Sequence, residues 1–108
     1  MRDEIIIKKL LAYTEKIINY CAGYDYDSFV TDSKLVEACV FNLSQMVELF
    51  KSVDSDYAQR HAQIPWNEMY GLRNRIVHDY DGVNMLLVWE IISGDLPELR
   101  EALSELVK

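Results

Sequence analysis

The stretch that decides the fold is IIKKLLAYTEKIINY, residues 6–20. Its apolar side chains recur at steps of three and four residues, the period of one helix face, at Ile6, Leu10, Tyr13, Ile17 and Tyr20. Asp3 and Glu4 suit the positive end of a helix dipole, and Gly23 suits the point where the chain leaves a helix. We therefore expect a long first helix that ends near Gly23.

The same period continues through the middle of the chain. After an acidic, turn-like segment with a short helical turn beyond Asp27, Thr31 or Asp32 can cap a second long helix. Asp54 or Ser55 can cap a further short helical turn. The second long helix has an apolar stripe at Val36, Cys39, Val40, Leu43, Met46, Val47 and Phe50.

A third long helix is expected from Pro65 to about Tyr80. Proline is favoured in a first helical turn, because the N–H that it lacks would have no partner there. Gly71 inside this helix either permits the close approach of another backbone or is a tolerated surface glycine. The helix after it holds Trp89 and ends at Gly94. Both tryptophans of the chain lie in helical stripes, so we expect them in the core rather than on a base-stacking platform.

The last helix is predicted over residues 96–106. Asp95 and Glu98 have the spacing of a capping box, an acid at the cap and a glutamate three residues on. The chain has no internal repeat and no alternating run of strand length. The sequence predicts one all-α domain, residues 1–108: an up-and-down bundle of four main helices plus short helical pieces.

The charge of the chain is strongly acidic but unevenly spread. The formal net charge is -7 over 108 residues, which argues against coating nucleic acid through bulk charge. Residues 57–78 nevertheless carry three arginines against one glutamate and hold both histidines. An acidic body therefore surrounds one short basic segment.

The two cysteines give no sign of an oxidising compartment, and the N-terminal segment and the apolar runs give no sign of a membrane. Cys21 and Cys39 each lie within an apolar helical pattern and are expected to be buried free thiols rather than a disulfide or a ligand pair. The N-terminus has acids at its front and lysines in its apolar stretch, unlike a signal peptide. The longest unbroken apolar run is far shorter than a bilayer requires. The expected location is cytoplasmic, without membrane association.

The residues that could carry chemistry are Arg73, Asn74, His78 and Tyr80. An arginine is a fixed cationic fork suited to phosphate oxygens, and a histidine can act as general acid or base near neutral pH. Together they could cleave RNA: the histidine would take the proton of the ribose 2′-OH, and the arginine would stabilise charge on phosphorus. The known metal and phosphate-loop motifs are missing from the sequence, so no metal or cofactor is expected.

Helical geometry restricts how Arg73 and His78 could cooperate. Five helical steps rotate by roughly 140°, so the two side chains would not share a face of an ideal helix. Within one subunit, the pair would depend on the long arginine side chain or on a distortion near the helix end. A two-fold dimer offers another solution, in which one composite cleft is assembled from both copies. The alternative is that both residues only interact with carbonyls and acids at a helix end. Seven steps would return Tyr80 to nearly the face of Arg73.

At these positions the sequence resembles a known family. Arg73-Asn74-x-x-x-His78-x-Tyr80 is similar to the signature of HepT-like toxins of the HEPN superfamily. The similarity extends over YGLRNRIVHDYDGVN, residues 70–84, then over residues 88–90 and 95–99, and over the helical layout of the whole chain.

This resemblance implies an α-helical homodimer with a composite cleft and metal-independent endoribonuclease activity on RNA such as tRNA or mRNA. It implies that Arg73 and His78 are catalytic and that Asn74 is supportive. It also implies a minimal nucleotidyltransferase antitoxin that transfers AMP to Tyr80, adding bulk and negative charge beside a cationic cleft. The other cationic or titratable residues of the basic segment are candidate contacts to RNA: Arg60, His61 and Arg75.

Two other functions are compatible with the same residues. The chain could be a non-catalytic substrate- or nucleotide-binding subunit that works with a nucleotidyltransferase, or a purely structural dimerisation protein. RNA cleavage that requires Arg73 and His78 would favour the ribonuclease. Partner or nucleotide binding without cleavage would favour the subunit.

Overall fold

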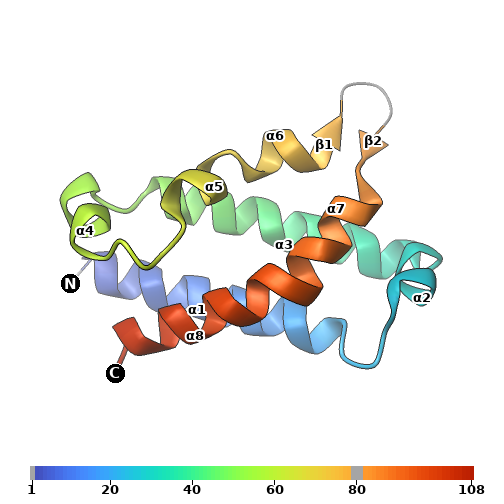
Figure 1. Ribbon diagram of the computed structural model, residues 1–108, viewed down its shortest axis with the longest axis horizontal. Coiled ribbons are helices and arrows are strands. Elements are labelled where there is room, and N and C mark those ends of the chain that lie inside the picture. The colour runs from blue at the N-terminus through green and yellow to red at the C-terminus, as the bar shows by residue number, and fades with distance from the viewer. Residues whose placement is uncertain (1, 79–81) are drawn as a thin grey trace.

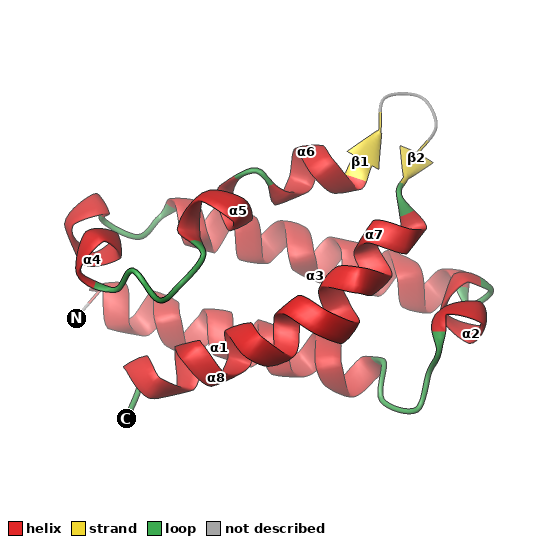
Figure 2. Ribbon diagram, viewed as in Figure 1, coloured by secondary structure: helices red, strands yellow, loops and turns green. Residues whose placement is uncertain are grey.

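The computed structural model describes residues 2–78 and 82–108, and most of them are helical. The elements, in chain order, are α1 (Arg2–Tyr20), α2 (Tyr26–Val30), α3 (Ser33–Lys51), α4 (Ser55–Arg60), α5 (Trp66–Tyr70), α6 (Leu72–Ile76), β1 (Val77–His78), β2 (Gly82–Val83), α7 (Met85–Glu90), η1 (Ile91–Asp95) and α8 (Leu96–Leu106). The expected all-α class is confirmed, with one two-stranded antiparallel hairpin added (Figure 2).

The helices form two layers. The long helices α1 and α3 lie antiparallel at the back of the view, while α7, η1 and α8 form one rod that crosses in front (Figure 1). The short helices α5 and α6 follow the length of α3 and lead into the hairpin. No helix in the described part of the chain is long and apolar enough to cross a membrane.

The first long helix forms as its apolar stripe predicts. Ile7, Leu10 and Ile17 are buried completely, and Thr14 joins them because its hydroxyl donates to the Leu10 carbonyl oxygen at 2.7 Å. The helix ends just before Gly23, which has a positive φ of 83°. This left-handed conformation carries little penalty for glycine, which has no Cβ.

Aspartates cap the two helices that follow. The Asp32 carboxylate accepts from the Leu35 N–H at 3.1 Å and caps α3, as predicted. Asp25 caps the shorter α2, which starts one residue before Asp27, and its carboxylate accepts from the Ser28 N–H at 2.9 Å. These bonds satisfy N–H groups that have no partner inside a helix.

The predicted helix from Pro65 to Tyr80 is wrong in its extent. The chain forms α5, turns at Gly71, forms α6 and then enters strand β1 at Val77. Glycine is a poor helix former, so α5 ends there, and the backbone of Val77 and His78 pairs with β2 instead of continuing a helix. Tyr80 lies outside the described residues. A Cβ at Gly71 would meet only the Asn67 carbonyl oxygen at 3.9 Å, so within the described chain no foreign backbone approaches it closely.

The predicted helix end at Gly94 and the predicted cap at Asp95 are also wrong. The helix continues through both residues as a π-helical turn, and Asp95 has helical φ and ψ angles with no side-chain capping bond. Pro97, two residues on, has no N–H to give to the Ser93 carbonyl, so an ordinary α-helical ladder cannot pass this point unbroken. A wider π turn lets the rod continue past this missing hydrogen bond, and in it the Leu96 N–H donates to the Ile91 carbonyl oxygen.

Both tryptophans belong to the core, as predicted. Trp66 packs edge-on against Phe50, with ring centres 5.7 Å apart, and its indole N–H donates to the His61 carbonyl oxygen at 2.9 Å. Trp89 is partly buried against Phe29 of α2, with ring centres 5.0 Å apart. Both indole rings therefore pack against other aromatic side chains of the protein.

Candidate active site

The candidate site begins on α6, a single turn whose orientation is set by two core residues. Leu72 and Ile76 are buried, and residues 73–75 between them are exposed. With its two ends anchored in the core, the turn must present Arg73, Asn74 and Arg75 outward. Neither arginine forms an ion pair with another described residue.

Arg73 lies on the α3 side of α6. It lines a narrow recess with Val40, Ser44 and Val47 of α3 and Ile76 of its own helix. The Ser44 hydroxyl donates to the Val40 carbonyl at 3.0 Å, so the polar atom nearest this recess is already held in place. In the sequence, Val40 and Val47 were visible only as members of the second apolar stripe, Ser44 carried no signal, and nothing paired these residues with Arg73.

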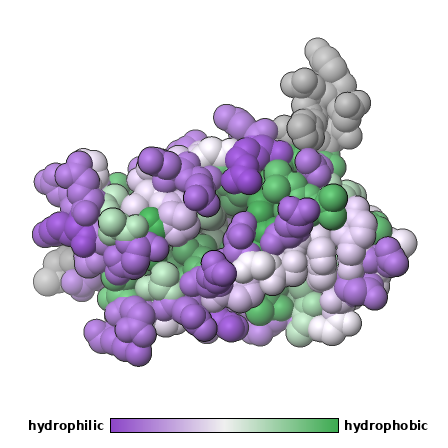
Figure 3. Space-filling model, viewed as in Figure 1, coloured by the Kyte–Doolittle hydropathy of each residue, from purple (hydrophilic) through white to green (hydrophobic). Residues whose placement is uncertain are grey.

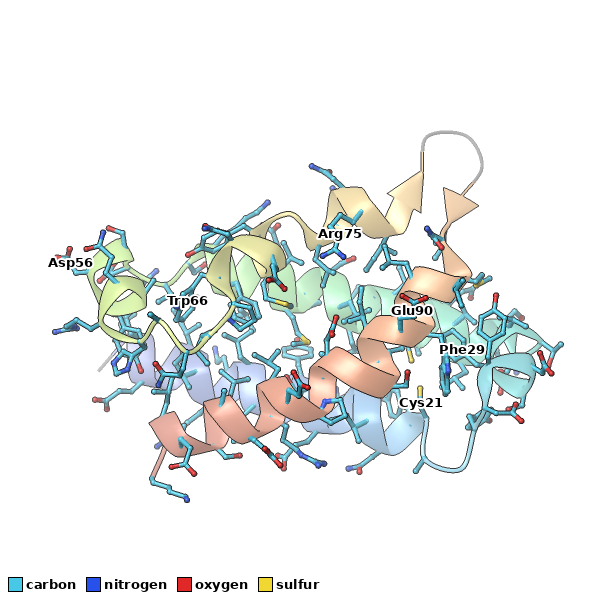
Figure 4. The ribbon with its side chains drawn as sticks, viewed as in Figure 1. Cys21, Phe29, Asp56, Trp66, Arg75 and Glu90 are labelled. Carbon is cyan, nitrogen blue, oxygen red and sulfur yellow. The ribbon has the colours of Figure 1, made fainter. Side chains whose placement is uncertain are left out.

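Arg75 lies on the opposite side of the same turn. It lines a recess with Glu68, Asp95 and Leu96, facing the rod rather than α3. In Figure 4 its side chain extends from α6 toward that rod, and Figure 3 shows apolar surface gathered between these elements. Residues two apart on a helix differ by about 200°, which explains why the two arginines separate.

The hairpin after α6 carries the rest of the motif. His78 pairs with Gly82 in the antiparallel ladder, and the Asn84 N–H donates to the Ile76 carbonyl at 2.7 Å where the hairpin meets the helices. The His78 side chain and all of Tyr80 lie outside what the structure describes. The ideal-helix relation between Arg73 and His78 does not apply, because the α-helix ends at Ile76 and His78 lies in β1; this is a distortion near the helix end, one of the alternatives considered for the pair.

Asn84 is the positioning residue that sequence reasoning missed. Besides its backbone bond, its side-chain oxygen accepts from the Leu87 N–H at 3.1 Å and caps α7. One residue thus fixes both the base of the hairpin and the start of the rod. An asparagine directly before the apolar run of residues 85–89 was the available signal.

Arg60 and His61 lie at a different place. They flank the end of α4, where the Arg60 guanidinium lies 5.9 Å from the centre of the Tyr57 ring and the His61 ring lies 4.3 Å from it. Figure 1 shows α4 at one end of the long axis, with α5 between it and α6. The structure thus does not bring these two residues together with Arg73. No group of three potential metal-binding side chains was found among the described residues.

Comparison with known proteins assigns the chain to a family. The family model described as "Ribonuclease HepT-like" matches residues 10–106, which is nearly the whole chain. The chain belongs to the HepT-like family of HEPN ribonucleases. This match includes α6, the hairpin and both layers of the bundle.

Individual relatives of this HepT-like chain carry ribonuclease names. "Putative RNase TTE0752" of Caldanaerobacter subterraneus subsp. tengcongensis is 30% identical over 102 residues, covering 94% of this chain and 91% of the relative. "Putative RNase MJ0125" of Methanocaldococcus jannaschii is 29% identical, covering 92% and 85%. "Probable ribonuclease HepT" of Thermococcus cleftensis is 30% identical, covering 77% and 76%. No solved structure gave a significant match.

Proposed function

We propose that this chain is a metal-independent endoribonuclease toxin that cleaves RNA at Arg73 and His78. The observation that carries the proposal is the exposed Arg73 guanidinium, unpaired among the described residues and held beside α3. A cation that the protein itself does not neutralise keeps its charge available for a phosphate. Membership of a ribonuclease family agrees with this use.

The proposed reaction uses each side chain for one task. His78 accepts the proton of the ribose 2′-OH, and the 2′-oxygen forms a bond to phosphorus. The bond from phosphorus to the 5′-oxygen breaks, and the leaving 5′-oxygen takes a proton from water, which gives a 2′,3′-cyclic phosphate and a 5′-hydroxyl. Arg73 donates hydrogen bonds to the phosphate oxygens as negative charge accumulates on them. Asn74, exposed beside Arg73, supports the same phosphate.

We further propose that the working unit is a homodimer with the cleft between its protomers. The break between α6 and β1 means that Arg73 and His78 are not related by one continuous helix. A two-fold arrangement would let the Arg73 of one copy meet the His78 of the other. It would also concentrate the basic segment of an otherwise acidic chain in one cleft.

Control of the toxin is proposed to act at Tyr80. A minimal nucleotidyltransferase antitoxin would transfer AMP from ATP to its hydroxyl, two residues after His78, with pyrophosphate as the leaving group. The added phosphate would repel RNA phosphate, and the nucleoside would fill the cleft. Co-expression with the antitoxin should add one or more adenylates to the intact mass of the wild type. The Tyr80→Phe variant should gain none, and an equal gain by that variant would refute this assignment.

Three variants test the ribonuclease assignment. Purified protein should cleave RNA in the presence of a chelator, and Arg73→Ala and His78→Ala should each lose at least about a hundredfold in rate with the fold intact. Arg75→Ala is the matched comparison: it removes the same charge from a candidate RNA contact on the other side of α6, and it should reduce the rate much less than Arg73→Ala. Equal losses in Arg73→Ala and Arg75→Ala, or no cleavage of tRNA and mRNA by unmodified wild type, would contradict the proposal.

A further inference from the structure

The two cysteines of the chain form a buried pair between two helices. Cys21 follows the last residue of α1, Cys39 lies in the middle of α3, and their Sγ atoms are 3.6 Å apart. Both thiols are free. They are 18 residues apart in the sequence, so helix packing rather than chain proximity brings them together.

The backbone positions of the pair are held by regular structure. The Cys21 N–H bonds to the carbonyls of Ile17 and Ile18, both at 3.2 Å, which continues the helical path of α1. Cys39 lies within a 19-residue helix. A disulfide bond is about 2.05 Å long, so the sulfurs need to approach by roughly 1.5 Å to form one.

The two thiols differ in access and in acidity. Cys21 retains 7% of its exposure, whereas Cys39 has none. When the Cys39 S–H group donates to the Cys21 sulfur, this hydrogen bond lowers the pKa of Cys21. The same hydrogen bond, and then burial, raise the pKa of Cys39. Of the two thiols, Cys21 is the one that a small oxidant in solvent can reach, so we expect it to react first.

We propose that Cys21 and Cys39 are an oxidisable dithiol that hydrogen peroxide converts into an intramolecular disulfide. The Cys21 thiolate attacks one peroxide oxygen, the O–O bond breaks, and a sulfenic acid forms at Cys21 with the release of water after protonation. The Cys39 sulfur then attacks the Cys21 sulfur, the S–O bond breaks, and a second water leaves. Both sulfurs are oxidised by one electron each, and the peroxide is reduced to two waters.

The disulfide would close a loop around α2. That loop contains the capped turn Tyr26–Val30, whose Phe29 packs against Trp89 of the rod; Figure 4 shows Cys21 and Phe29 at the same end of the molecule. Cross-linking the ends of such a loop removes conformations from the unfolded chain. The oxidised protein should therefore unfold at a temperature higher by about 5 °C or more.

Mass spectrometry of the folded, full-length protein tests the proposal. Peroxide should remove two hydrogen atoms from the wild type, and digestion without reductant should yield one peptide pair joined through Cys21 and Cys39. Reduction by dithiothreitol should restore the mass and the lower Tm. Wild-type thiols that both stay reduced while the protein remains folded, or disulfides that form only between chains, would overturn the proposal.

Two single variants test the order of the steps. In Cys39→Ser, peroxide should leave a sulfenic acid on Cys21 that dimedone traps. In Cys21→Ser, the remaining Cys39 should label at least about tenfold more slowly, because its side chain is completely buried. Equal labelling of the two variants, with both folded by circular dichroism, would contradict the assignment of Cys21 as the first thiol to react.

Discussion

Asn84 donates its backbone N–H to the carbonyl oxygen of Ile76 at 2.7 Å, and this bond joins the end of α6 to the start of α7 across the hairpin that carries His78. The Asn84 side chain caps α7 through the Leu87 N–H. The residue therefore sets how the motif segment meets the rod. Its effects on stability can be separated from those of the proposed catalytic groups.

Removing the Asn84 side chain should destabilise the protein. Asn84→Ala loses the cap on α7 and should lower the free energy of unfolding by about 1 kcal/mol, measured by urea denaturation. Asp95→Ala is the control, because Asp95 stands before α8 without a side-chain capping bond and should change stability by less than about 0.5 kcal/mol. If Asp95→Ala lowered the free energy of unfolding as much as Asn84→Ala, the loss in Asn84→Ala could not be assigned to its cap.

The planar fork of Arg73 should matter beyond its charge. Arg73→Lys keeps a cation but loses paired N–H donors, so RNA cleavage by the variant should fall by about tenfold or more. Arg75→Lys, on the other side of α6, should retain nearly the wild-type rate. Initial rates on one RNA at fixed salt concentration give the comparison. Full activity in Arg73→Lys would mean that Arg73 contributes a point charge only.

Two phenylalanines give a matched test of the core. Phe29 is completely buried against Trp89, and Phe29→Ala should lower the free energy of unfolding by about 3–5 kcal/mol. Phe41 on α3 is 62% exposed, and Phe41→Ala should change it by under about 1 kcal/mol in dilute protein. Chemical denaturation followed by Trp fluorescence measures both. Similar losses in the two variants would argue that the Phe41 face is covered in solution.

Acid should weaken the cap of α2. The Ser28 N–H, which donates to the Asp25 carboxylate, holds the pKa of that group below its ordinary value of 3.8. A lowered pKa means that the stabilisation is present above pH 3.8 and is lost as the pH falls through the lowered value. Asp25→Asn keeps a capping oxygen without the titration.

Thermal unfolding between pH 7 and pH 2 tests this sign. The wild type should lose more stability than Asp25→Asn on acidification, because the extra stability that the charged carboxylate gives the wild type is present at neutral pH and lost in acid. Identical pH profiles would show that the Asp25 carboxylate contributes nothing through its charge.

The long elements were predictable because local signals agree with the tertiary structure. The stripe of residues 6–20, the acids before it and the cap at Asp32 all lie where α1 and α3 require them. The break at Gly71 carried a local signal as well, but one glycine in a helical pattern does not reveal whether the helix continues. Where α6 ends is decided by the pairing of β1 with β2, and this pairing brings together residues 77–78 and 82–83.

In the rod, by contrast, the sequence predicts a helix end where the helix continues. Gly94, Asp95 and Pro97 form a local pattern typical of one helix ending and the next beginning. Burial of Ile92 and Leu96 against the other layer outweighs that pattern, and a π turn keeps both in the core without a break in the helix. Local capping preferences are worth about 1 kcal/mol, less than the burial of two large apolar side chains.

The sequence by itself determined the helical class, the two long helices and the residues of the motif, because helical period, caps and residue chemistry are local properties. Tertiary structure alone decided that Arg73 faces α3 while Arg75 faces the rod, and that Cys21 meets Cys39. Those relations depend on which surfaces of separate helices are buried together. Packing of the two layers settles that, and no short segment of the chain contains the information.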